Sequence, residues 1–250
     1  MAGDSSDAVG VVTAPQAGAA PLTVFAAPAT STEFNTLGER LVPKACFKVE
    51  DLLFDFGSSF IRPEMKDHLP KLTQLRNDNK VGDVFPPLSI FGHADPVGDD
   101  DLNKVLSGRR AIAFYAMLVR DADLWESLFT PPVHDDNWGT RSVQTMLSTV
   151  QEPIGIDGTA GPETQTAIRT FQKANGLGVD GVAGPATRKV LYRAYMDKLC
   201  GPDLQLDKSS DFLARNKDGA GGKGDFQGCS EFNPLRVFSK AESARFSTYP

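Results

Sequence analysis

Two copies of one short pattern constrain the fold of this chain more than any other sequence feature. IGIDGTAGPETQTAI (154–168) and LGVDGVAGPATRKVL (177–191) share an Asp-Gly pair, an Ala-Gly-Pro run and a Thr in the same order. Asp-Gly favours a tight turn, and Gly-Pro favours the start of a helix. Neither turn-helix unit can bury its apolar face alone. We therefore expect the two to pack together and against a first helix around RSVQTML (141–147).

Three pairs of matching residues have predicted roles in this repeat. The aspartates should form turns rather than contact a ligand, and the apolar pair should be buried. The threonine hydroxyls should satisfy free backbone amides in the first helical turn. The pairs are Asp157 and Asp180, Thr164 and Thr187, and Ile168 and Leu191.

The first half of the chain alternates between strand-like and helix-like patterns. Strands are expected over 47–56 and 87–95, and helices over 62–75 and 100–121. This order indicates an α/β unit. Pro63 lies near the start of the first helix, and Pro70 should kink or shorten it.

The predicted core positions follow from helical spacing. In the first helix they form one apolar stripe: Met65, Leu69, Leu72 and Leu75. In the second they are Leu102, Val105, Ala111, Tyr115 and Leu118.

The composition indicates an ordinary globular protein and excludes several partners. A net charge of −6 argues against general binding to nucleic acid or to an anionic membrane surface. No stretch approaches the ~20 apolar residues of a membrane span, and the N-terminus lacks the features of a secretory signal. Cys200 and Cys229 either pair in an oxidising compartment, leaving Cys46 free, or all three are reduced thiols.

The segment from Gln144 to Leu191 resembles the peptidoglycan-binding type 1 domain, a small three-helix module. The resemblance rests on DGxxGPxT in both copies, on Phe171-Gln172 and on Gly176-Leu177. It implies targeting to the bacterial cell wall. The motif defines no ligand contacts in this module.

The segment from Phe47 to Arg120 resembles the OmpA-like C-terminal domain. Its landmarks are FDFGSSFIRPE (54–64), GHADPVGDDDLN (92–103) and LSGRRA (106–111). The resemblance implies binding to the diaminopimelate of the peptidoglycan stem peptide through Asp95 and Arg110.

The chemistry of these two residues suits that ligand. Diaminopimelate ends in an ammonium and a carboxylate on one carbon, and an Asp with a bidentate Arg complements both charges. Asn103 and Gly98 should shape the loop between them, and backbone amides at Gly57, Ser58 and Ser59 should face the ligand. The alternative is a surface salt bridge worth about 0–1 kcal/mol. Arg109 is expected to be solvated.

The C-terminal part departs from the OmpA-like pattern. GCSEFNP (228–234) resembles the family's third-strand motif, whereas its concluding NRRV segment is absent. We therefore predict that the helical module is inserted into the α/β domain. The predicted organisation is a flexible arm (1–43), the first part of the OmpA-like domain (44–124), the helical module (125–200) and a Gly-rich linker with a return to the sheet (201–250).

No pattern in the chain is typical of an enzyme. His68, His93 and His134 fit no metal motif, and VHDD (133–136) is more typical of a polar loop. Asp99, Asp100 and Asp101 suit a solvated helix start. We predict no catalysis, no cofactor and no metal site. The expected function is peptidoglycan binding in the cell envelope or periplasm. The alternatives are a docking component of a larger envelope-crossing machine with protein partners, or a hydrolase accessory.

Overall fold

The computed structural model describes residues 9–12, 22–25, 38–39, 45–49, 53–93, 100–213 and 225–229. The chain divides into two compact units, Met1–Cys46 and Phe47–Pro250. Each is described by itself.

The N-terminal unit contains a small antiparallel sheet. Strand β1 (Val9–Val12) pairs with β2 (Leu22–Phe25), and β2 pairs with β3 (Gly38–Glu39). No strands were predicted for these three segments, and the flexibility of the arm over 1–43 stays a prediction. Their alternation is too short to stand out in an Ala- and Gly-rich sequence.

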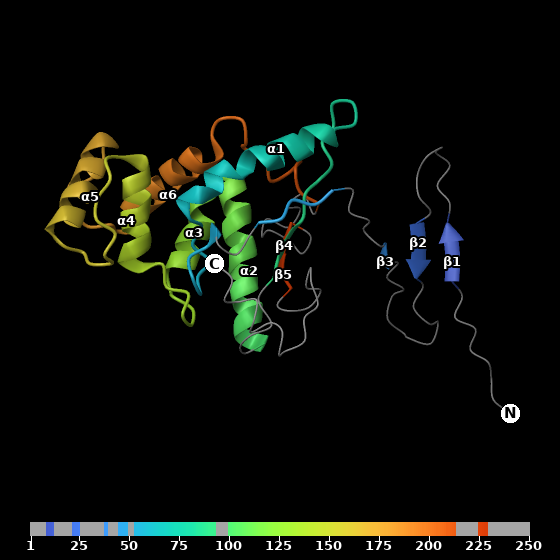
Figure 1. The fold of residues 1–250 in the computed structure, drawn as a ribbon, viewed down its shortest axis with the longest axis horizontal. Helices are drawn as coiled ribbons and strands as arrows, with labels where there is room; N and C mark the ends of the chain where they lie inside the picture. Colours follow the sequence, from blue (N-terminus) through green and yellow to red (C-terminus); the bar gives the residue numbers. More distant parts are fainter. Residues whose placement is uncertain are drawn as a thin grey trace. The chain divides into compact units, whose positions relative to one another are not determined.

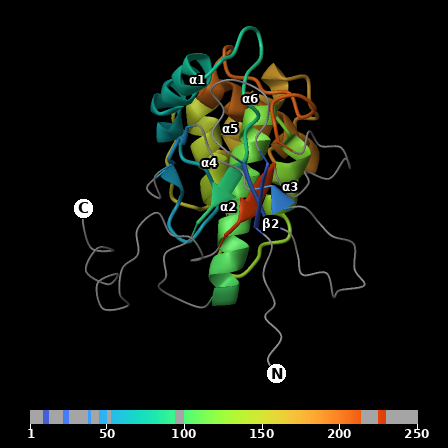
Figure 2. The same cartoon turned by 90° about the vertical axis from the view of Figure 1, so that its right-hand side faces the viewer.

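Helices dominate the second unit (Figure 1). They are the 3₁₀ helix η2 (Pro63–Asp67), α1 (Leu69–Asp78), α2 (Asp100–Val119), α3 (Ala122–Phe129), α4 (Gly139–Val150), α5 (Pro162–Ala174) and α6 (Pro185–Cys200). Figure 2 shows the length of α2 relative to the elements around it. Both repeat helices begin at the proline of Gly-Pro, as predicted, with Gly161 and Gly184 as their N-caps.

The segment 62–78 forms two helices in place of the predicted one. Pro63 begins η2, and Pro70 lies in the first turn of α1, where its missing amide breaks no helical hydrogen bond. Met65, Leu69 and Leu72 are buried as expected. Leu75 is half-buried.

The sheet of the second unit is smaller than an OmpA-like domain requires. In the part of the chain that the structure describes, it consists of β4 (Ile90–Gly92) and β5 (Phe226–Gly228), which are parallel. In the described residues of the predicted strand over 47–56 (47–49 and 53–56), the strand pairing is one antiparallel bridge, Phe54 with Ile61. An OmpA-like βαβ fold is therefore not confirmed, and the described part of this unit is rich in helix.

The chain returns to β4 after the helical module. Leu88 bridges Phe212 in parallel, and two residues further on Ile90 pairs with Phe226. One side of the segment 88–92 is thus covered by two pieces of the C-terminal region. The predicted Gly-rich stretch, 218–224, lies outside the described residues. The pairing has the order that an inserted module requires, although the insertion itself stays a prediction.

Two glycines bring this sheet directly onto α2. A Cβ at Gly92 would lie 1.9 Å from the carbonyl oxygen of Ser107, and a Cβ at Gly228 would lie 2.5 Å from the amide nitrogen of Gly108. No side chain fits at either crossing. Further along α2, Ala111, Tyr115 and Leu118 are buried as predicted.

The N-terminal part of α2 contradicts the predicted core. Leu102 is 40% exposed and Val105 is 36% exposed. Helical spacing identified the buried positions Ala111, Tyr115 and Leu118, but it could not indicate that the close approach of β4 and β5 to α2 lies at Ser107 and Gly108.

One aromatic cluster joins the first part of this unit to the helical module. Phe60 lies 5.3 Å from Trp138 and 5.9 Å from Tyr195, centroid to centroid, and Trp125 lies 5.1 Å from Trp138. The Tyr195 hydroxyl donates to the Ile61 carbonyl oxygen at 2.9 Å. The two parts therefore share one core, and removing the module would expose it.

Two further features bear on predictions from the sequence. The three cysteines are free thiols: Cys46 is exposed, Cys200 is buried and Cys229 is half-buried. Among the described residues, no helix combines the length and the apolar character needed to cross a bilayer.

Candidate functional site

Arg110 occupies a buried, well-defined position on α2. Its Nε donates to the carbonyl oxygen of Ser58 at 2.9 Å, and its guanidinium lies 5.0 Å from the ring centroid of Phe54. Its exposed fraction is 9%. Residues of the segment 53–61 therefore hold the guanidinium, and Arg110 is not a loosely solvated surface residue.

The Gly57–Ser59 turn differs from its predicted role. Gly57 has a φ of 63°, which favours glycine. The amide of Ser58 donates to the Asp55 carbonyl oxygen at 3.0 Å, and the amide of Ser59 donates to Asp136 at 2.8 Å. These two amides are used inside the fold, so the prediction that they face a ligand was wrong.

Asp136 is the residue that organises this turn. It is 3% exposed, and it accepts hydrogen bonds from the hydroxyls of Ser58 and Ser59, both at 2.6 Å. Trp138 adds a hydrogen bond from its Nε1 to Ser59 Oγ at 3.0 Å. The VHDD segment was predicted to be a polar loop, and its pattern gives no sign that Asp136 is buried.

Arg109 is buried rather than solvated, contrary to prediction. Its Nε donates to Asp136, and its Nη2 donates to the Leu128 carbonyl oxygen. Two adjacent arginines of α2 are therefore fixed in different ways: Arg109 by α3 and the loop that follows it, and Arg110 by the Gly57–Ser59 turn.

Of the remaining predicted site residues, the structure describes Asn103. Asn103 is half-buried on α2, two helical turns before Arg110 and so on the same side of the helix. Asp95 and Gly98 follow β4 in the sequence and lie outside the described residues.

Each copy of the repeat is closed by a buried glutamine. Gln144 Nε2 lies within hydrogen-bonding distance of Asp157 Oδ1 (2.7 Å), Thr164 Oγ1 (2.9 Å) and the Thr159 carbonyl oxygen (3.1 Å). Its Oε1 accepts from the Gly158 amide at 2.7 Å. One side chain of α4 thus holds both the turn and the start of α5.

Gln172 does the same in the second copy. Its Nε2 lies 2.7 Å from Asp180 Oδ1 and 3.1 Å from both Thr187 Oγ1 and the Val182 carbonyl oxygen. Its Oε1 accepts from the amides of Asp180 and Gly181. We call each of these arrangements a glutamine clamp.

The clamps explain the two aspartates of the repeat. Hydrogen bonds from Gln144 and from the Thr159 amide lower the pKa of Asp157, and bonds from Gln172 and the Val182 amide lower the pKa of Asp180. The aspartates are turn formers, as predicted.

The other two pairs have mixed outcomes. The apolar pair, Ile168 and Leu191, is buried as predicted. The threonines were expected to satisfy backbone amides at the helix starts, and they do not. Thr164 Oγ1 donates to the Thr159 carbonyl oxygen, and both threonine hydroxyls bond the clamp glutamine.

The segment that contains these helices and clamps matches a known family. Residues 139–191 match the family model described as "Putative peptidoglycan binding domain". The match covers all of α4 and α5 and the first part of α6, including both clamps. It supports peptidoglycan as a ligand of the protein and association with the cell wall.

The match is limited to this module. No curated protein and no solved structure matches the chain significantly. Within the described residues, no group of three or more His, Cys, Asp or Glu side chains could hold a metal ion.

Proposed function

We propose that this protein is a non-catalytic peptidoglycan binder of the cell envelope, with residues 139–191 as its wall-recognition module. The family match over this segment carries the proposal. The two glutamine clamps support it, because they satisfy the polar groups of both repeat turns inside the module. The turns are thereby fixed in shape before a ligand binds.

We further propose that Arg110 and Asp95 form a second site, for the zwitterionic end of diaminopimelate. The close approach of Gly92 to Ser107 and Ala111 supports this, since it places the end of β4 beside the turn of α2 that carries Arg110. Asp95 follows Gly92 by three residues, so chain connectivity limits their Cα separation to about 11 Å. A fixed guanidinium and a nearby carboxylate would complement the two charges of the ligand.

The other predicted residues contribute in different ways. The Ser58 carbonyl oxygen orients Arg110. Gly57 provides the positive φ that the turn requires. Asn103, on the same side of α2 as Arg110, would be a further polar contact. Two wall-binding sites on one chain would raise the effective concentration at a polymeric target, so that overall binding exceeds that of either site.

Sedimentation with purified sacculi tests both levels of the proposal. The full chain is used throughout, because the two parts share one core. Sacculi containing diaminopimelate are compared with sacculi that contain lysine in its place. The test variants are Asp95→Asn and Arg110→Lys, which keeps the charge but loses bidentate geometry. The control, Lys71→Gln, removes one exposed charge from α1. Circular dichroism and urea midpoints confirm folding.

We expect the wild type to sediment with both wall types and to prefer the diaminopimelate wall. Both site variants should lose this preference, and Lys71→Gln should keep it. A wild type that stays in the supernatant would refute wall binding. Equal binding of wild type to both walls would refute only the diaminopimelate site. Release of soluble muropeptides would refute a non-catalytic role.

A further inference from the structure

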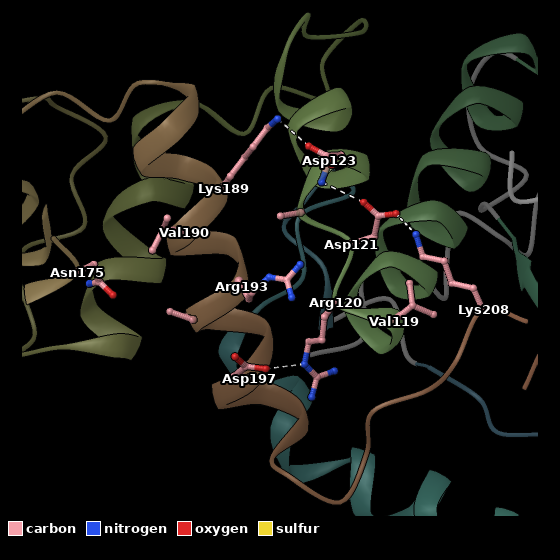
Figure 3. A pocket seen from close by; sticks show the side chains of 12 residues that line it. Val119, Arg120, Asp121, Asp123, Asn175, Lys189, Val190, Arg193, Asp197 and Lys208 are labelled. Atoms are coloured by element: carbon pink, nitrogen blue, oxygen red, sulfur yellow. Dashed lines mark hydrogen bonds and ion pairs between the residues drawn. The ribbon is translucent and has the colours of Figure 1, made fainter. Parts of the chain in front are cut away.

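A charged groove lies between α3 and α6, and it includes neither Arg110 nor the clamp glutamines. Its volume is about 710 Å³, and it opens to solvent. Figure 3 shows Arg193 extending from α6 into this groove, toward the segment that joins α2 to α3. The groove lies where the peptidoglycan-binding module meets the rest of the unit, since α3 precedes the matched residues and α6 begins within them.

The walls of this groove are firmly joined. Arg188 forms a bidentate ion pair with Glu126, and the Tyr192 hydroxyl donates to the same carboxylate at 3.0 Å. The rings of Tyr192 and Trp125 lie 5.8 Å apart, which adds aromatic packing between α6 and α3. A ligand would therefore meet a preformed shape, and little ordering cost would oppose binding.

Three of the four basic side chains that line the groove are neutralised. Lys189 pairs with Asp123 at 2.6 Å, Arg120 pairs with Asp197 at 2.7 Å, and Lys208 pairs with Asp121. Burial opposes ionisation of Asp121, but the hydrogen bonds from Lys208 and from the Leu124 amide outweigh it and lower the pKa of Asp121. Asp121 is therefore held in its charged form beside Lys208.

Arg193 is the fourth basic residue, and it is exposed. Within the part of the chain that the structure describes, Arg193 forms no ion pair or hydrogen bond through its side chain. The groove therefore carries one uncompensated positive charge, on a planar group that suits a carboxylate.

The neighbouring acids define which anion fits. The Asp123 and Asp197 side chains are 81% and 62% exposed, so both carboxylates retain oxygens that face solvent. These oxygens would accept N–H groups of a peptide. They would also repel a doubly charged phosphate more strongly than a singly charged carboxylate.

We propose that the α3–α6 groove binds a carboxylate end of the stem peptide, with Arg193 as its anchor. This inference rests on the proposed function, since it names a further ligand contact for a wall-binding protein. It places recognition at the boundary of the module, on residues from both sides. Individual affinity should be weak, with a Kd in roughly the millimolar range, as expected for a few exposed charged hydrogen bonds.

Nuclear magnetic resonance titration of the full chain tests the groove. The probe is N-acetyl-Lys-D-Ala, in which the terminal carboxylate is the only one, and the comparison is its C-terminal amide. Neither contains diaminopimelate, so the Arg110 site is not the readout. Arg193→Gln is the test variant, and Lys198→Gln removes an exposed charge from α6 outside the groove. Inorganic phosphate is titrated separately.

We expect shifts in the amides of Asn175, Lys189 and Ala194, with binding at least about tenfold weaker for Arg193→Gln or for the amidated peptide. Lys198→Gln should bind as the wild type does. The groove assignment is wrong if the acid does not bind, if Arg193→Gln or the amide binds equally, or if phosphate binds more tightly. Sacculus sedimentation of the same sample separates the two ideas: wall binding without peptide binding refutes the groove alone, and absent wall binding refutes the proposed function.

Discussion

The backbone amide and the hydroxyl of Ser59 donate to the two carboxylate oxygens of Asp136, at 2.8 Å and 2.6 Å. The two residues are 77 positions apart in the sequence. Through Arg109, the same carboxylate also holds α2. One buried acid therefore ties the loop before α4 to the turn that orients Arg110.

Replacing this acid should destabilise the whole second unit. Asp136→Asn leaves Arg109 buried without its charge partner, and breaking a buried ion pair in this way costs about 3–5 kcal/mol. Urea unfolding followed by tryptophan fluorescence measures the loss. Asp135→Asn, at an exposed neighbouring position, is the matched control and should change stability by less than about 0.5 kcal/mol. Equal effects of the two variants would contradict the central role of Asp136.

Removing a glutamine clamp should loosen its repeat turn. Gln172→Ala loses several hydrogen bonds, each worth about 0.5–1.5 kcal/mol net, so we expect a total loss of about 2–4 kcal/mol. The amide of Gly181, which donates to Gln172, should exchange with solvent faster. Gln165→Ala, on the exposed side of α5, should leave both the stability and this exchange rate unchanged. Unaltered exchange at Gly181 in Gln172→Ala would show that the clamp does not hold the turn.

The clamps also predict a component of acid sensitivity. Their hydrogen bonds lower the folded-state pKa of Asp157 and Asp180, so these carboxylates stabilise the fold above their unfolded pKa of about 3.9. This stabilisation is lost as the pH falls through the lower folded-state pKa. The melting temperature of the wild type should therefore drop more steeply below pH 4 than that of the Asp157→Asn, Asp180→Asn double variant. Parallel curves for the two proteins would contradict the assignment.

The crossing of β5 over α2 should not tolerate a side chain. In Gly228→Ala, the new Cβ would lie 2.5 Å and 2.6 Å from backbone atoms of Gly108, which cannot move aside as a flexible side chain would. We expect destabilisation of about 1–3 kcal/mol, measured as a lowered urea midpoint. The control is Gly178→Ala, where a Cβ meets nothing within 4 Å. A midpoint unchanged by Gly228→Ala would mean that β5 does not dock there in solution.

The starts of the repeat helices and the forms of their turns were predictable because each depends on a few adjacent residues. Gly-Pro limits the backbone to a helix start, and Asp-Gly favours a turn, whatever surrounds them. The burial of Ile168 and Leu191 followed from helical spacing. The resemblance of the 144–191 segment to a wall-binding module agrees with the matched family model.

Tertiary contacts decided what these local signals could not. Nothing near Arg109 in the sequence indicates Asp136, and nothing near Leu102 in the sequence indicates that its side chain stays exposed. The pairing of Gly92 with Gly228 joins residues on either side of the helical module. Local conformation depends on backbone preferences and neighbouring side chains, so the sequence alone determined it here. The burial of a charge or a helix face depends on which distant surfaces meet, and only the folded chain decides that.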